Sequence, residues 1–140
     1  MLINTRLIRV QWGDCDPAGI VYYPRYFEWF DAGTILLFEK ATGLTKIRML
    51  ERYGGAGLAL IEAGAKFAVP SQYGDDIEIA TSIKEFGRSS FAVAHRVTKA
   101  GELALEGWER RVWTVRDPDD ASRLRSAPIP AEVLAGFARS

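Results

Sequence analysis

With 140 residues, the chain is long enough for one compact domain and too short for two of ordinary size. Eighteen basic residues balance eighteen acidic ones, so no global field would gather nucleic acid or an anionic membrane. The 48% hydrophobic and 26% charged content is that of globular proteins, which argues against disorder and against a coiled coil.

The N-terminal stretch MLINTRLIRV has neither a long apolar region nor a small-residue cleavage site. No uncharged apolar run approaches the about 18 residues of a membrane span. The single cysteine, Cys15, cannot form an intrachain disulfide, which suits a reducing compartment. We therefore expect a cytoplasmic protein without a membrane anchor.

The first predicted strand covers residues 6–12, RLIRVQW, which alternate imperfectly between polar and apolar before the stretch GDCDPAG ends them. Pro24 suits the first turn of a helix, where its missing N–H would have no partner. Spacings of three and four residues predict this helix over about residues 24–42, with Gly43 ending it. The residues on its predicted buried face are Phe27, Phe30, Thr34, Leu37, Phe38 and Ala41.

A short second helix is predicted over residues 46–53, and a terminal one over 131–138. Between them the hydrophobic period changes to two, and turn signals separate four strand candidates. These are residues 58–70, 77–86, 90–99 and 103–115, which we expect to form an antiparallel meander. The whole layout is α+β: one curved antiparallel sheet around one long central helix, in a single domain over residues 1–140. Long strands with exposed edges also favour pairing with a second copy.

The stretch GDCDPAG holds Asp14 and Asp16 and leaves three interpretations open. It is a plain turn, because Asp and Asp-Pro start turns and Gly19 can close one. It is a magnesium-dependent phosphotransfer site, although the predicted meander does not suit the parallel domain that this chemistry needs. Or it presents an acid to a helix N-terminus, whose free N–H groups polarise a carbonyl that the carboxylate attacks or that an activated water attacks.

The segment GDCDPAGIVYYPRYFEWFD, residues 13–31, resembles the signature of the hot-dog-fold acyl-CoA thioesterases, particularly the 4-hydroxybenzoyl-CoA thioesterase branch. The resemblance continues through VPSQYGDDIEI and IKEFGRSSF. It implies a hot-dog fold, in which a five-stranded antiparallel sheet wraps a long central helix. It implies hydrolysis of an acyl-CoA, with no metal and no cofactor besides the CoA of the substrate. It also implies a homodimer or homotetramer whose active site is shared between subunits.

By this resemblance, Asp16 is catalytic, as nucleophile or general base on the thioester. Tyr23 matches the residue whose backbone N–H contacts the thioester carbonyl. Gly19 and Ile20 lie in the turn that shapes the pocket. Asp31, at the edge of the predicted helical face, either pairs with an arginine or hydrogen-bonds a polar acyl group such as an aryl hydroxyl.

The family's cluster for CoA phosphates falls at Gly87-Arg88-Ser89. Close relatives carry three consecutive basic residues there, whereas this chain keeps Arg88, with Lys84 shortly before it. The planar fork of Arg88 suits bidentate phosphate contacts, but a solvated turn arginine is an equally good interpretation.

His95, the only histidine, lies in register with apolar residues of its strand and is expected to be structural. Hot-dog dehydratases rely on a catalytic histidine, so dehydration is disfavoured. Cys15 is expected to pack in the turn. Trp108 and Trp113 should face opposite sides of the last strand. Glu62 is kept as a second candidate acid.

The sequence therefore predicts an acyl-CoA thioesterase, with an aryl-CoA such as 4-hydroxybenzoyl-CoA as the first substrate to test. Two alternatives stay open: a short-chain aliphatic acyl-CoA thioesterase, and a non-hydrolytic protein on the same fold that binds acyl-CoA or acyl carrier.

Overall fold

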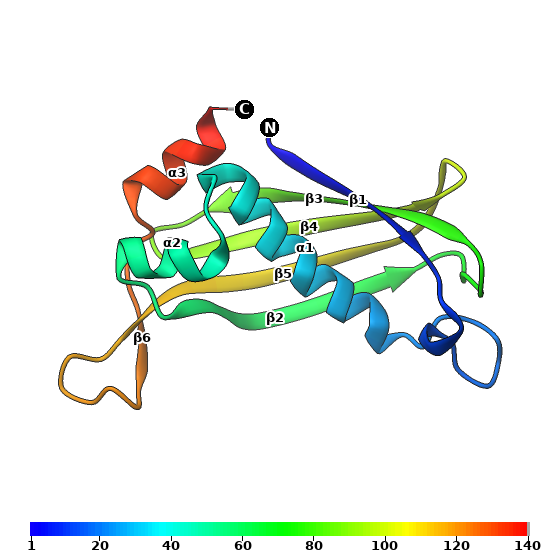
Figure 1. Cartoon of the computed structure of the whole chain (residues 1–140), viewed down its shortest axis with the longest axis horizontal. Coiled ribbons are helices and arrows are strands. Elements are labelled where there is room, and N and C mark those ends of the chain that lie inside the picture. Colours follow the sequence, from blue (N-terminus) through cyan, green and yellow to red (C-terminus); the bar gives the residue numbers. More distant parts are fainter. Residues whose placement is uncertain (140) are drawn as a thin grey trace.

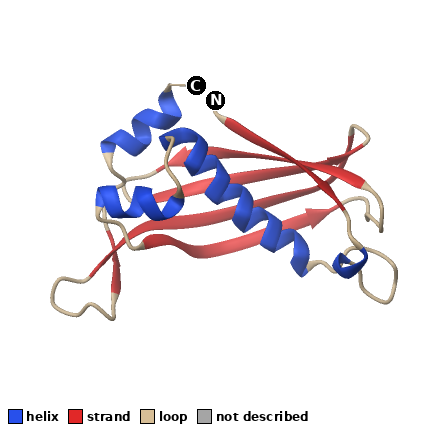
Figure 2. Ribbon diagram, viewed as in Figure 1, coloured by secondary structure: helices blue, strands red, loops and turns tan. Residues whose placement is uncertain are grey.

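A long helix, α1 (Pro24–Thr42), lies across one face of an antiparallel sheet (Figures 1 and 2). The computed structural model describes residues 1–139. The strands are β1 (Ile3–Arg9), β2 (Gly57–Phe67), β3 (Asp76–Phe86), β4 (Ser90–Lys99), β5 (Glu102–Arg116) and the short β6 (Leu124–Ser126). The five long strands lie in the order β1-β3-β4-β5-β2, and β6 extends the sheet beside β5.

The first strand differs from the prediction of residues 6–12. Strand β1 ends at Arg9 because its whole length pairs with β3, from Ile3 opposite Ser82 to Arg9 opposite Asp76. Val10 then donates its N–H to the Asp75 carbonyl, and residues 12–14 form a 3-10 turn instead of strand. The turn therefore starts earlier than the sequence pattern indicated.

The predicted four-strand meander is correct for β3, β4 and β5 and wrong for β2, which pairs with β5 at the far edge. The connection 68–75 crosses three strand spacings, about 14 Å, which eight residues easily span. On the way, the Ser71 carbonyl accepts from the N–H of Val21, so the crossing passes beside the start of α1. Strands β1 and β2 are the two edges of the long-strand path.

Helix α1 has the predicted bounds and ends at Gly43, whose φ of 71° is the left-handed conformation that glycine adopts easily. Its buried residues are Tyr26, Phe30, Gly33, Thr34, Leu37, Phe38 and Ala41. Phe27 is only partly buried, so the buried face is centred one position earlier than predicted at this end.

Two further helices, α2 (Lys46–Tyr53) and α3 (Ala131–Ala138), cover the C-terminal half of α1 and have their predicted bounds. Trp113 is buried and Trp108 is 44% exposed, as their separation on β5 predicted. In the described part of the chain, no helix has the length and apolar character needed to cross a bilayer.

Candidate active site

Asp14 and Asp16 have different surroundings in the turn before α1. The Asp14 carboxylate accepts the N–H of Gln11 at 2.8 Å, so it braces the turn. One carboxylate oxygen of Asp16 accepts the N–H of Ala18 at 2.9 Å. Its other oxygen makes no hydrogen bond within residues 1–139. Both aspartates are partly buried, and each keeps one carboxylate oxygen without a hydrogen bond within the described residues. Asp16 differs in that its backbone N–H donates to the carbonyl of Ile20, a residue that lines the cavity at the start of α1.

The start of α1 leaves one backbone donor free. Pro24 has no N–H, and the N–H groups of Arg25 and Tyr26 already donate to the carbonyls of Tyr22 and Tyr23. Across residues 1–139, the N–H of Tyr23 has no acceptor. It lies at the positive end of the helix dipole, where a carbonyl oxygen that gains negative charge would be stabilised.

The helix start opens onto a cavity of about 360 Å³. Its lining is mostly apolar and consists of Ile20, Val21, Tyr23, Tyr26, Phe67, Ala68, Val69, Pro70 and Ser71. The turn reaches it through Ile20, whose carbonyl accepts the N–H of Asp16 at 2.9 Å. Gly19, with φ of 83°, closes that turn in a conformation that disfavours other residues. Burial raises the pKa of the Tyr26 hydroxyl, which lies beside Ser71.

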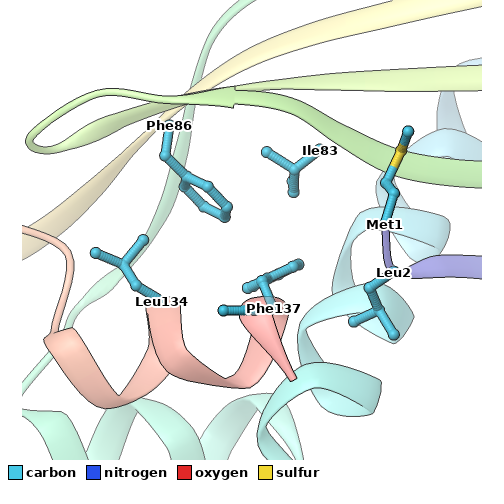
Figure 3. Close-up of a pocket in the computed structure, with 7 residues that line it drawn as sticks. Met1, Leu2, Ile83, Phe86, Leu134 and Phe137 are labelled. Atoms are coloured by element: carbon cyan, nitrogen blue, oxygen red, sulfur yellow. The ribbon is translucent and has the colours of Figure 1, made fainter. Parts of the chain in front are cut away.

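A second cavity, of about 310 Å³, lies near the chain termini and α3, at the other end of α1 (Figure 3). Figure 3 shows Ile83, Phe86, Leu134 and Phe137 around it, together with Met1. Its lining residues are apolar, so it offers no acid or base for attack on a thioester.

The predicted phosphate-binding residues lie far from Asp16 within one chain. The turn of Arg88 and Ser89 follows the C-terminal end of β3, and the Arg88 carbonyl accepts the N–H of Ile129 beside α3. The Asp16 turn lies beside the other end of β3, roughly 30 Å away along the strand. The Arg88 side chain is exposed and makes no ion pair within the described residues. Lys84 is exposed on β3, over a broad groove of about 870 Å³.

A buried carboxylate joins α1 to the sheet. Glu109 on β5 accepts hydrogen bonds from Thr34 of α1 at 2.6 Å and from Arg111 at 2.9 and 3.2 Å, and His95 lies at 3.5 Å. Burial alone would raise the pKa of Glu109, but the neighbouring His95 and the hydrogen bonds from Arg111 and Thr34 outweigh it and lower the pKa to about 2. Glu109 is therefore a buried anion at neutral pH.

Arg111 extends this buried group to the surface. Its guanidinium bonds Glu109, donates to the carbonyl of Leu58 on β2 at 2.9 Å, and reaches the carboxylate of Asp31 at 2.7 Å. Burial acts to lower the pKa of Arg111, but the two carboxylates raise it above its ordinary value. Asp31 thus pairs with an arginine, one of the two roles that the sequence left open.

His95 is part of the same core. Its imidazole stacks on Phe30 with ring centres 4.4 Å apart, and its Nδ1 lies 2.8 Å from the hydroxyl of Thr81. The side chain is fully buried, as the structural interpretation predicted. Cys15 is partly buried and packs against the hydrophobic core beside Tyr26.

Sequence reasoning missed Glu109 and Arg111. Both lie on β5 in the same parity as Leu105, Gly107 and Trp113, which are all buried. Two opposite charges two residues apart in a strand point to the same face, and when the other residues on that face are apolar they indicate a buried ion pair. Asp31, the partner of Arg111 on α1, could not be found in this way, because the two residues are 80 positions apart in the sequence.

The comparisons with known proteins agree with this architecture. A model of the thioesterase-like superfamily matches residues 10–137. The 4-hydroxybenzoyl-CoA thioesterase of Pseudomonas sp. strain CBS-3 is 38% identical over 133 residues, which cover 90% of this chain and 91% of that protein. A solved variant of 4-hydroxybenzoyl-CoA thioesterase in complex with 4-hydroxybenzoyl-CoA matches with a TM-score of 0.88 at 32% identity, covering 98% of this chain and 99% of that one. A gentisyl-coenzyme A thioesterase matches with a TM-score of 0.79 at 31% identity, covering 96% and 99%.

A long helix on an antiparallel sheet, matched to these structures over nearly its whole length, defines a hot-dog protein. The chain belongs to the thioesterase-like superfamily. It is a thioester hydrolase, so the predicted fold class and reaction class are confirmed.

Proposed function

We propose that this thioester hydrolase cleaves an acyl-CoA, with an aryl-CoA such as 4-hydroxybenzoyl-CoA as its substrate, to the free acid and CoA. The proposal rests on two groups that flank one turn beside a mostly apolar cavity: a carboxylate oxygen of Asp16 and the backbone N–H of Tyr23. Neither group has a hydrogen-bond partner within the described residues. The 38% identity to a 4-hydroxybenzoyl-CoA thioesterase supports the acyl group.

In the proposed reaction, the thioester carbonyl oxygen accepts a hydrogen bond from the Tyr23 N–H. The carbonyl carbon is attacked by the Asp16 carboxylate, or by a water from which Asp16 takes a proton. The C–S bond then breaks, and the CoA sulfur leaves and is protonated. Direct attack gives a mixed anhydride with Asp16, which water hydrolyses to the acid. The helix dipole favours the oxyanion in both routes.

On the acyl side, Gly19 and Ile20 shape the mouth of the cavity, and the carboxylate of Asp31 accepts a hydrogen bond from a polar group on the acyl ring. On the CoA side, Arg88 meets a phosphate, with Ser89 and Lys84 beside it. Because Arg88 lies at the opposite end of β3 from Asp16, we propose that the Arg88 that serves a given Asp16 belongs to a second copy of the chain.

Assembly as a homodimer or homotetramer would supply that second copy. Strand β2 supports it: its outer edge is unpaired in the described residues, and Leu60, Ile61 and Phe67 on it are each more than half exposed. The proposal uses no metal and no cofactor besides the CoA of the substrate, and it places the enzyme in the cytoplasm.

A thiol-release screen across aryl, short-chain and long-chain acyl-CoA esters tests the proposal. We expect the highest kcat/KM with an aryl ester. A preference for short aliphatic chains would overturn the aryl assignment and leave the reaction class intact. Binding of acyl-CoA without thiol release at any acyl length would instead support the alternative of a non-hydrolytic binding protein.

A further inference from the structure

We propose that Arg111 is a positioning residue that sets the substrate preference of the enzyme by holding the Asp31 carboxylate in one orientation. This inference rests on the proposed function, because it concerns the acyl group that the active site accepts. Arg111 itself is buried and would not touch the substrate; it would act through Asp31.

The guanidinium of Arg111 cannot turn away from its partners. All three of its nitrogens donate: Nε to Glu109 at 2.9 Å, one terminal nitrogen to the Leu58 carbonyl at 2.9 Å, and the other to Asp31 at 2.7 Å. Glu109 is in turn fixed by the hydroxyl of Thr34. The planar fork is thus locked to β2, to β5 and to α1 at once.

Asp31 is held by one oxygen only. Its Oδ1 accepts from Arg111, and its Oδ2 has no partner within residues 1–139. The Asp31 side chain is 56% exposed, whereas that of Arg111 is 7% exposed. The arrangement therefore presents one oriented carboxylate oxygen outward from a rigid support.

The charge balance determines what that oxygen can accept. Glu109 already neutralises Arg111, so Glu109, Arg111 and Asp31 together carry one negative charge in excess, and it lies on the exposed Asp31. A carboxylate only accepts hydrogen bonds. It therefore favours an acyl group that carries a hydrogen-bond donor, such as a hydroxyl, and disfavours one that carries a second carboxylate.

The position of Asp31 fits a donor at the far end of an aryl ring. Asp31 follows Tyr23 by two helical turns, about 12 Å along the axis. A hydroxybenzoyl group with its hydroxyl opposite the thioester, hydrogen-bonded at both ends, has about this length.

The test compares kcat/KM for 4-hydroxybenzoyl-CoA with that for benzoyl-CoA, which lacks the hydroxyl. The variants are Arg111→Lys, Asp31→Asn and Asp31→Glu, which keeps the charge but displaces the oxygens. Arg110→Lys is the matched control, because the exposed Arg110 lies on the other face of β5 and pairs there with Glu85 of β3. Thermal melting of each variant checks the fold.

We expect each of the three variants to lower the ratio of the two kcat/KM values about tenfold or more, mainly through KM for the hydroxylated ester. The benzoyl-CoA value should change little, and the control should keep the wild-type ratio. An unchanged ratio in Asp31→Asn or Asp31→Glu would overturn the inference, and this holds even if Arg111→Lys failed to fold. An equal loss of kcat/KM for both esters in a folded Arg111→Lys would also overturn it. If the wild type cleaved no CoA ester, the proposed function itself would fail.

Discussion

The hydroxyl of Thr34 donates a 2.6 Å hydrogen bond to the carboxylate of Glu109, and this contact joins the central helix to the middle of the sheet. Both side chains are at least 95% buried. An ionised carboxylate is expensive to bury unless it is fully hydrogen-bonded, and here Arg111 and Thr34 supply the donors. The helix is thus fixed to the sheet by a charged contact inside an otherwise apolar core.

This contact predicts a specific acid sensitivity. The folded pKa of Glu109 is about 2, below the ordinary 4.5, so its ionised form stabilises the fold above pH 4.5 and this contribution is lost as the pH falls toward 2. Urea unfolding across that range should show a smaller loss of stability in Glu109→Gln than in the wild type. At neutral pH the variant should be less stable by about 3 kcal/mol. Equal losses on acidification in both proteins would contradict the assignment.

The two aspartates of the turn should separate in kinetics. Asp16→Asn should lower kcat by about three orders of magnitude or more while acyl-CoA binding is largely retained, because the charged oxygen is lost and the turn is kept. Asp14→Asn keeps an oxygen for the N–H of Gln11 and should cost less than tenfold in kcat. Thiol release and equilibrium binding of an acyl-CoA measure the two effects. Wild-type turnover in Asp16→Asn would remove that residue from the mechanism.

The role of the Tyr23 N–H can be tested by removing it. Tyr23 has φ of −54°, which proline adopts, so Tyr23→Pro deletes the donor with little strain at that residue. We expect kcat to fall by about a hundredfold or more. Tyr23→Ala keeps the backbone donor and serves as the control; its side chain is 61% exposed and its loss should leave kcat within a few-fold. If both substitutions reduced kcat equally, the phenol ring and not the N–H would matter.

Two glycines that face tryptophan or phenylalanine rings should respond differently to alanine. A Cβ at Gly107 would lie 2.3 Å from the ring of Phe30, which is fully buried and stacked on His95. Gly107→Ala should therefore lower stability by about 2 kcal/mol. A Cβ at Gly64 would lie equally close to Trp108, but that ring is 44% exposed and can move, so Gly64→Ala should cost less. Chemical denaturation of both variants gives the comparison, and a larger cost at Gly64 would refute it.

The unpaired edge of β2 should determine assembly. Ile61 lies at the bulge of β2 and is 59% exposed, so Ile61→Lys places a charge on the edge that we expect to meet a second copy. Native mass measurement should show a dimer or tetramer for the wild type and a smaller species for this variant. Ile47→Lys on α2, where the side chain is 70% exposed, is the control. A monomeric wild type would exclude a shared active site.

Strong local signals allowed the helices to be predicted from sequence. Pro24 and Gly43 mark the ends of α1 by properties of single residues, and both ends were correct. The strands of the meander were found because their alternation is local. The pairing of β2 with β5 was missed, since no local pattern states which distant strand completes an edge. The predicted first strand, residues 6–12, lies three residues later than β1, because pairing with β3 and not the alternation within β1 determines where the strand ends.

In the candidate site too, the residues that are close in sequence could be predicted and the contacts between distant residues could not. Asp16, Gly19 and Tyr23 belong to one continuous segment, so a local motif is enough to bring them together. The contact between Arg111 and Asp31 joins residues 80 apart and depends on how the helix lies on the sheet. Only the parity of Glu109 and Arg111 hinted at it.

The strand order also constrains when the chain can fold. Strand β1 pairs only with β3 among the long strands, and β2 only with β5, so residues 1–67 contain no strand pair of their own. During synthesis, the aromatic face of α1 has no sheet to cover it until β3 to β5 have emerged. Folding must therefore wait for contacts of high sequence separation, which slows the search and keeps an apolar helix exposed to aggregation. A nascent chain that stops before β5 is a strong candidate for chaperone binding.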